Sequence, residues 1–226
     1  MRTHSHGPFL RRDAGFTLVE LTIAAALLAM VLGSVALVAG SSERVYRTES
    51  VHSHLEAQAG RTMLHLCEEL RQAGVDTLFP APATGVAASA VQYVQAIGIE
   101  GGVVQWTSLR RLELQYEPGE IDDGLDNNGN ELVDEMRLVL IEAPGSPDEV
   151  RRVLTRWVSE LLEGESANGL DDNGNGLVDE PGFSLEGSGR AVTVRFTLER
   201  RTNEGALLRR TAVSTVRPRN VLGGAP

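Results

Sequence analysis

A single apolar stretch near the N-terminus constrains the fold of this chain more than any other feature. Residues 16–40 read FTLVELTIAAALLAMVLGSVALVAG, and Glu20 is the one charged residue among them. About 20 apolar residues are enough for a helix to cross a bilayer. The segment after Glu20 supplies that length without a charge. We therefore expect residues 16–40 to form a transmembrane helix.

The residues before this stretch are polar and end in a glycine. They read MRTHSHGPFLRRDAG, with three arginines and one acidic residue. A secretory signal loses its apolar core because that core precedes the cleavage site, whereas here the small residue Gly15 precedes the apolar run. Cleavage after Gly15 would keep the whole apolar helix in the mature protein. The arginines predict that residues 1–15 stay in the cytoplasm.

The sequence GFTLVEL at residues 15–21 resembles the cleavage and methylation motif of type IV prepilins and type II secretion pseudopilins. The resemblance implies that prepilin peptidase cuts between Gly15 and Phe16 and that Phe16 is N-methylated. It also implies that Glu20 pairs with the N-terminal amine of a neighbouring subunit during assembly, because an unpaired carboxylate is costly in hydrocarbon. The alternative is that Glu20 snorkels to the cytoplasmic interface.

Apolar residues recur at helical spacing beyond residue 40, which indicates an amphipathic continuation of the helix. The resemblance then implies an α+β, pilin-like fold, in which a long N-terminal helix, half transmembrane and half amphipathic, packs on an antiparallel β-sheet domain with two acidic loop insertions. The expected parts are a leader (1–15), a transmembrane and assembly helix (16–40), its amphipathic continuation (41–74), a globular β-rich periplasmic domain (75–219) and a disordered tail (220–226).

Strand patterns follow the helix. The segments that carry them are 91–99, 112–116, 136–141, 191–198 and 207–216. Residues 76–90 hold two prolines and many small residues, and we expect a loop there. Residues 146–162 fit two structures. A Ser-Pro-Asp-Glu start and a shared apolar face favour a helix, whereas RRVLTRWVSELL resembles a strand-and-turn segment of J-type minor pseudopilins and W-type minor pilins.

An acidic segment of the chain occurs twice. GLDNNGNELVDE at residues 124–135 recurs as GLDDNGNGLVDE at residues 169–180, with two positions changed. Oxygen-bearing side chains two residues apart suit a hard cation such as calcium, which takes several oxygen ligands. The candidate metal ligands are Asp126, Asn128, Asn130 and Asp134 in the first copy and Asp171, Asn173, Asn175 and Asp179 in the second.

The repeat resembles the start of an EF-hand loop and, more closely, the short calcium repeats of thrombospondin type 3 and dockerin proteins. An EF-hand would place a glutamate twelfth from the first aspartate, where this chain has Arg137 and Gly182, and the nearest glutamates, Glu135 and Glu180, lie too early. We therefore expect a short loop of weak affinity, closed by the last aspartate of each copy. The alternative is a pair of solvated Asn/Gly turns whose acids serve solubility.

Composition narrows the function further. The formal net charge of −10 argues against nucleic-acid binding, and the single cysteine, Cys67, excludes an intrachain disulfide. The sequence contains no G-x-S-x-G nucleophile motif and no phosphate-loop glycine pattern. We therefore expect a protein that is not an enzyme.

The resemblance implies a structural minor pilin or pseudopilin, assembled at or near the tip of a type II secretion pseudopilus or type IV pilus. Its partners would be prepilin peptidase, other pilin or pseudopilin subunits and the inner-membrane assembly platform. It would cross the bacterial inner membrane once, with the C-terminal domain in the periplasm. The alternative is a membrane-anchored, calcium-dependent adhesion or binding module that uses the pilin export route. Secretion, pilus and competence systems are not separated by the sequence.

Overall fold

The computed structural model describes residues 15–202 and 204–221, with the backbone alone for residues 41–45 and 47. Of the expected leader, only Gly15 lies within the described residues. The chain forms two compact units, Met1–Arg47 and Thr48–Pro226. The boundary between these units falls inside the long N-terminal helix.

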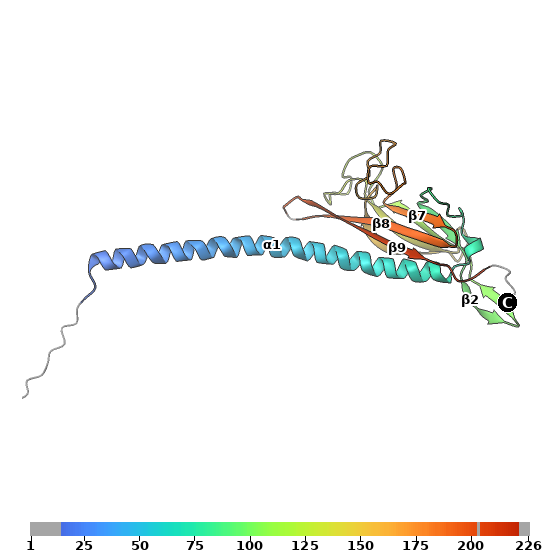
Figure 1. The fold of residues 1–226 in the computed structure, drawn as a ribbon, viewed down its shortest axis with the longest axis horizontal. Coiled ribbons are helices and arrows are strands. Elements are labelled where there is room, and N and C mark those ends of the chain that lie inside the picture. The colour runs from blue at the N-terminus through green and yellow to red at the C-terminus, as the bar shows by residue number, and fades with distance from the viewer. Residues whose placement is uncertain (1–14, 203, 222–226) are drawn as a thin grey trace, which may run out of the picture. The chain divides into compact units, whose positions relative to one another are not determined.

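Helix α1 (Leu18–Gln72) has 55 residues and is drawn from blue to teal in Figure 1. It has no proline and is rich in alanine and leucine, which favour helix. It ends where the chain turns into the sheet, since the N–H of Gly74 donates to the carbonyl of Val94 at 3.0 Å. The expected long helix is therefore confirmed.

The second unit contains one large antiparallel sheet. Its strands are β1 (Ala90–Tyr93), β4 (Arg110–Tyr116), β5 (Met136–Glu142), β6 (Val150–Val158), β7 (Phe183–Ser188), β8 (Ala191–Arg201) and β9 (Leu207–Val216). Their order is β1-β4-β5-β6-β8-β7, and β9 pairs with β8 along its other edge. The β6–β8 junction rests on a single residue pair, Val158 and Leu198. A short helical turn, η1 (Val75–Thr77), and a separate hairpin of β2 (Ala96–Glu100) and β3 (Val103–Trp106) complete this unit.

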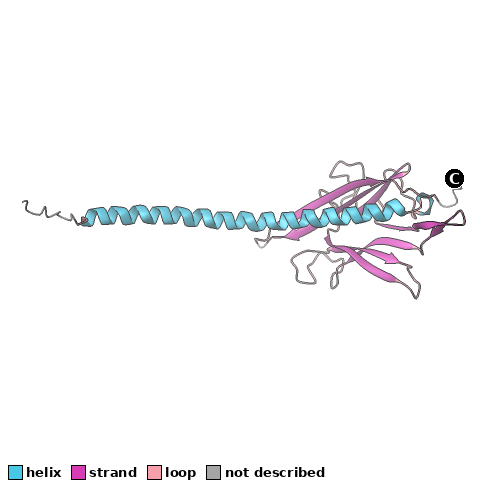
Figure 2. Ribbon diagram, turned by 90° about the horizontal axis from the view of Figure 1, so that it is seen from below, coloured by secondary structure: helices cyan, strands magenta, loops and turns pink. Residues whose placement is uncertain are grey.

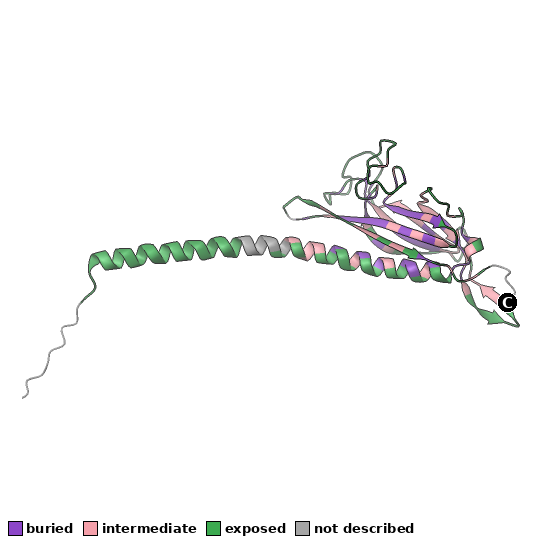
Figure 3. Ribbon diagram, viewed as in Figure 1, coloured by how far each residue is buried: buried purple, intermediate pink, exposed green. Residues whose placement is uncertain are grey.

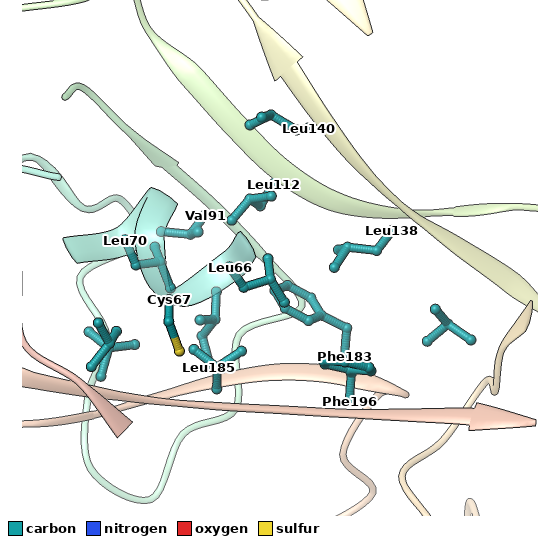
Figure 4. Packing of buried hydrophobic residues seen from close by; sticks show 14 of the residues in the cluster. Leu66, Cys67, Leu70, Val91, Leu112, Leu138, Leu140, Phe183, Leu185 and Phe196 are labelled. Carbon is teal, nitrogen blue, oxygen red and sulfur yellow. The ribbon is translucent and has the colours of Figure 1, made fainter. Parts of the chain in front are cut away.

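The core of the second unit lies between the C-terminal half of α1 and the sheet, whose strands extend to both sides of the helix in Figure 2. Figure 4 shows Leu66 and Leu70 of α1 packed towards Leu112, Phe183 and their neighbours on the strands. Leu66, Leu70, Leu112 and Phe183 are fully buried, and each such side chain stabilises the fold by about 1.5–3 kcal/mol. This packing confirms the α+β, pilin-like architecture.

Four of the expected strand segments are found, in β4, β5, β8 and β9. The segment 91–99 is divided between β1 and β2, and strands β3 and β7 were not expected. Residues 150–158 form strand β6, so the helix alternative for 146–162 is wrong. The backbone pairing with β5 accounts for this outcome, together with the exposure of Val150 (46%) and Val153 (48%), which leaves no continuous buried helical face.

The expected tail begins inside an ordered contact. The carbonyl of Asn220 accepts the N–H of Val75 at 2.8 Å, and its side-chain amide donates to the carbonyl of Gln72 at 2.8 Å. Residues 222–226 lie outside the described residues. The segment that follows β9 is thus tied to the end of α1.

Candidate functional site

The start of α1 is built by a reciprocal pair of hydrogen bonds between Thr17 and Glu20. The Glu20 carboxylate accepts the backbone N–H and the hydroxyl of Thr17, both at 2.9 Å. The N–H of Glu20 donates to the Thr17 hydroxyl oxygen at 3.2 Å. This is a capping box, which satisfies N–H groups that the first helical turn leaves unpaired. It holds the Glu20 carboxylate at the backbone N–H of Thr17, at the start of the helix.

The side chains in the first half of α1 are not buried within the first unit. Residues 15–40 are all exposed (Figure 3), and Phe16 is 89% exposed. Within the described part of the chain, Leu18–Gly40 is the one helix long and apolar enough to cross a membrane. An apolar surface of this extent needs a bilayer or other subunits around it.

The two acidic repeats form the loops that leave β4 and β6, and both lie in the upper part of the second unit in Figure 1. Leu132 and Leu177 anchor them, because each is at most 3% exposed. The neighbouring Val133 and Val178 face solvent. One residue of each apolar pair is therefore buried, and the other faces solvent.

The two loops share one backbone conformation. Both have positive φ at the same four places, and these are Gly124, Gly129, Glu131 and Asp134 in the first loop and Gly169, Gly174, Gly176 and Asp179 in the second. Such φ values are unusual for residues with a side chain. The sequence repeat is therefore also a structural repeat.

The first aspartate of each loop holds the turn together. Asp126 accepts the N–H of Gly129 and of Glu131, each at 2.7 Å. Asp171 accepts the N–H of Gly174 at 2.7 Å and of Gly176 at 2.8 Å. Burial raises the pKa of the Asp126 carboxyl, but the backbone N–H groups outweigh burial and lower that pKa overall.

The asparagines of each loop point their side chains at a glutamate. In the first loop, the amide nitrogens of Asn128 and Asn130 donate to Glu135 Oε1 at 2.8 and 2.5 Å. In the second, the amide nitrogen of Asn175 donates to Glu180 Oε1 at 2.5 Å. The structure thus brings the two asparagines of the first loop together at Glu135.

The last aspartates face the beginning of each loop. Asp134 accepts the N–H of Gly124 at 2.8 Å, and Asp179 accepts the N–H of Gly169 at 2.9 Å. The geometry makes each of them a brace that closes the loop backbone. Whether they also bind a metal, as expected from the sequence, stays a prediction.

The sequence reasoning missed two glutamates that precede the loops. Glu120 accepts the N–H of Asn128 at 2.7 Å, and Glu165 accepts the N–H of Asn173 at 3.1 Å. Both are more than nine-tenths buried. A signal was available, because a Gly-Glu pair at 119–120 recurs at 164–165 with the spacing of the repeat.

The interior of the loops is rich in carboxylate oxygen. Glu135 and Glu180 are fully buried, and one oxygen of each, together with one oxygen of Glu120, has no hydrogen-bond partner. Burial raises the pKa of Glu180, and the nearby carboxyl of Glu165 raises it further, while the amide of Asn175 acts in the opposite direction. Between residues 15 and 221, Asn203 aside, no group of three or more His, Cys, Asp or Glu side chains that could hold a metal is found. A metal here would need amide or main-chain oxygens as additional ligands.

A comparison with known families matches one part of the chain. Residues 10–36 fit the family described as the prokaryotic N-terminal methylation motif. The matched segment includes the Gly15–Phe16 bond and the capping box at the start of α1. No curated protein and no solved structure matches the chain.

Proposed function

Because the chain carries the prokaryotic N-terminal methylation motif, we propose that it is a prepilin-type structural subunit of a pilus or pseudopilus. Prepilin peptidase cuts it between Gly15 and Phe16, and Phe16 becomes the methylated N-terminus. The single observation that carries this proposal is the matched motif at the head of a helix whose apolar first half, residues 18–40, is exposed throughout. The helix remains in the mature chain and anchors it in the inner membrane before assembly.

Helix packing between subunits is the proposed mode of assembly. The exposed apolar surface of residues 16–40 is covered first by lipid and then by the helices of neighbouring subunits. Glu20 sits in the first turn, where its hydrogen bonds to Thr17 satisfy the carboxylate in a free subunit. In the filament the methylated amine of a neighbour competes for this carboxylate, which sets the stagger between helices.

Mass spectrometry of the mature N-terminus tests the processing step. The protein is purified from its own membrane, digested, and searched for its N-terminal peptide. The proposal expects a peptide that starts at methylated Phe16. An intact leader, or an N-terminus beyond residue 40, would overturn it.

We place the subunit among the minor components, at or near the filament tip, with its second unit in the periplasm. Support comes from the resemblance of RRVLTRWVSELL to J-type and W-type minor subunits and from the strand that this segment forms. Quantitative immunoblotting of sheared filaments tests the assignment, with a few copies per filament expected. A copy number like that of the major subunit would contradict it. A protein found only in membranes, never in filaments, would favour the calcium-dependent adhesion module instead.

The two acidic loops are proposed to bind calcium. Their shared backbone conformation and the buried, unpartnered glutamate oxygens in both loops support an oxygen-rich site. The ligands proposed from the sequence repeat are Asp126, Asn128, Asn130 and Asp134 in the first loop and Asp171, Asn173, Asn175 and Asp179 in the second. Calorimetric titration of the full chain with calcium tests this role, and an absence of binding heat and of any thermal shift would refute it.

A further inference from the structure

Buried acids in the second unit fall into two groups. Those outside the acidic loops have arginine partners, since Glu117 pairs with Arg156 at 2.6 Å and Glu199 with Arg209 at 3.1 Å. The four loop glutamates, in contrast, take part in no ion pair among the described residues. They are Glu120, Glu135, Glu165 and Glu180. A buried carboxylate without a compensating cation strongly destabilises a fold.

Hydrogen bonding does not make up for the missing cations. Glu120 Oε2, Glu135 Oε2 and Glu180 Oε2 are inaccessible to solvent and have no donor. Native proteins leave few buried polar atoms without a partner. Two of these oxygens, on Glu135 and Glu180, lie at equivalent places in the two copies of the motif, which indicates a ligand common to both loops.

The glutamates of each loop also lie together. In the second loop, Glu165 accepts the backbone N–H of Asp179, the residue next to Glu180, at 3.2 Å. In the first loop, Glu120 and Glu135 contact the same residue, Asn128, through its backbone N–H at 2.7 Å and its side-chain amide at 2.8 Å. Two buried carboxylates this close repel each other unless a proton or a cation lies between them.

We propose that each glutamate pair, Glu120 with Glu135 and Glu165 with Glu180, directly binds one divalent cation in its loop. This inference rests on the calcium role proposed above and adds the ligands that the repeat pattern did not contain. The remaining ligands of each site are amide or main-chain oxygens, since the described residues hold no group of three acidic, histidine or cysteine side chains suited to a metal. In this assignment Asp134 and Asp179, which the repeat pattern offers as ligands, act as braces of the loop backbone instead.

The added carboxylates change the expected selectivity and affinity. More ligand charge tightens calcium binding, and a site with many oxygen ligands favours calcium over the smaller magnesium ion, which prefers six ligands and retains its waters. The loops should therefore bind calcium more tightly than the asparagine-rich repeat alone would indicate. Two cations per chain are expected, one for each loop.

Calorimetric stoichiometry of the full chain in detergent micelles tests the proposal. After removal of metal with a chelator, the wild-type protein should take up two calcium ions. Glu135→Gln and Glu180→Gln should each leave a single strong site, and the affinity of the altered loop should fall by about tenfold or more.

Thermal unfolding in chelator distinguishes a metal ligand from a glutamate that only stabilises the fold. Each Gln variant should unfold at or above the wild-type midpoint, since a neutral amide removes charge repulsion.

Two controls separate ligands from other buried acids. Asp134→Asn should lower the unfolding midpoint equally with and without calcium and keep two bound ions. Glu199→Gln should also keep two ions, because Glu199 has an arginine partner. Two tight ions in Glu135→Gln, or a lower midpoint of that variant in chelator, would overturn the glutamate proposal alone. A wild-type chain that binds no calcium would end both metal proposals and leave the N-terminal processing result untouched.

Discussion

At the scale of single residues, Glu131 is where the two acidic loops differ most. Its φ is 69°, whereas the equivalent residue, Gly176, has a φ of 91°. A side chain in this left-handed region is strained, and glycine is not. The first loop adopts the repeat's conformation in spite of its sequence. The hydrogen bond from Glu131 N–H to Asp126 helps to hold it there.

We predict that Glu131→Gly stabilises the protein by about 0.5–1 kcal/mol, because it relieves the strain at positive φ. Gly176→Glu should destabilise the second loop by a similar or larger amount. The measurement is the free energy of unfolding from urea titration in detergent. Glu131→Gln is the control, since it removes the charge and keeps the strain. If the Gln variant were as stable as the Gly variant, the gain in free energy of unfolding would come from loss of the charge and not from relief of strain.

Glu199 links stability to pH. Burial raises its pKa, and the guanidinium of Arg209 opposes this shift without cancelling it. The folded protein therefore binds the proton more tightly than the unfolded chain, whose glutamates titrate near about 4.3. Stability attributable to this group is lost as the pH rises from the unfolded pKa through the raised folded pKa.

The expected result is that wild-type protein gains stability relative to Glu199→Gln when the pH falls from 7 to 4. Unfolding midpoints of both proteins, measured in chelator at several pH values, give the comparison. A difference between the two proteins that does not change with pH would contradict the assignment. So would a wild-type advantage that grows towards pH 7.

The candidate site was only partly predictable at this scale. Asp126, Asn128 and Asn130 stand out by spacing, and the structure places them in one compact loop. Glu135 was set aside because an EF-hand needs its glutamate two residues later, but the shorter turn brings the Asn130 side chain onto it at 2.5 Å. Glu120 was missed because a ligand outside the obvious repeat becomes apparent only when the chain folds back.

At the scale of elements, regular patterns predicted their strands correctly, whereas residues 146–162 fitted two structures, of which the structure shows the strand. The alternation in 191–198 and 207–216 indicated a hairpin that the structure has, as β8 and β9. Strand β7 was not expected, because it is short and contains Gly187, which packs directly against the backbone of Pro82. Neighbours that are distant in sequence decide such a segment. The same holds for β6, where pairing with β5 prevails over a helical apolar pattern.

Two leucines of α1 allow the contribution of core packing to stability to be distinguished from that of helix propensity. Leu66 is fully buried in the core, whereas Leu64, two residues earlier in α1, is 69% exposed. Leu66→Ala should lower the free energy of unfolding by about 2–5 kcal/mol, because it leaves a cavity against the sheet. Leu64→Ala should change it by less than about 0.5 kcal/mol. Urea unfolding of the two variants gives the comparison. Equal losses in the free energy of unfolding would contradict the burial of the helical face that carries Leu66.

At the scale of the whole molecule, the two compact units meet different surroundings. The second unit buries its own core between α1 and the sheet. The first unit exposes an apolar helix that is long enough to cross a membrane. This contrast could be predicted from the sequence, because the long uncharged apolar run after Glu20 is compatible with few structures. The retained helix as the assembly interface is the central claim of the account.

Incorporation of a Glu20→Ala variant into filaments tests that claim most directly. The variant and wild type are expressed at equal levels, and the amount of each in sheared filaments is compared with the amount in membranes. Thr22→Ala serves as the control, since it removes a neighbouring polar side chain of the same helix. We predict normal processing of Glu20→Ala with loss from the filament fraction, and wild-type behaviour of Thr22→Ala. Equal incorporation of Glu20→Ala and wild type would contradict the account.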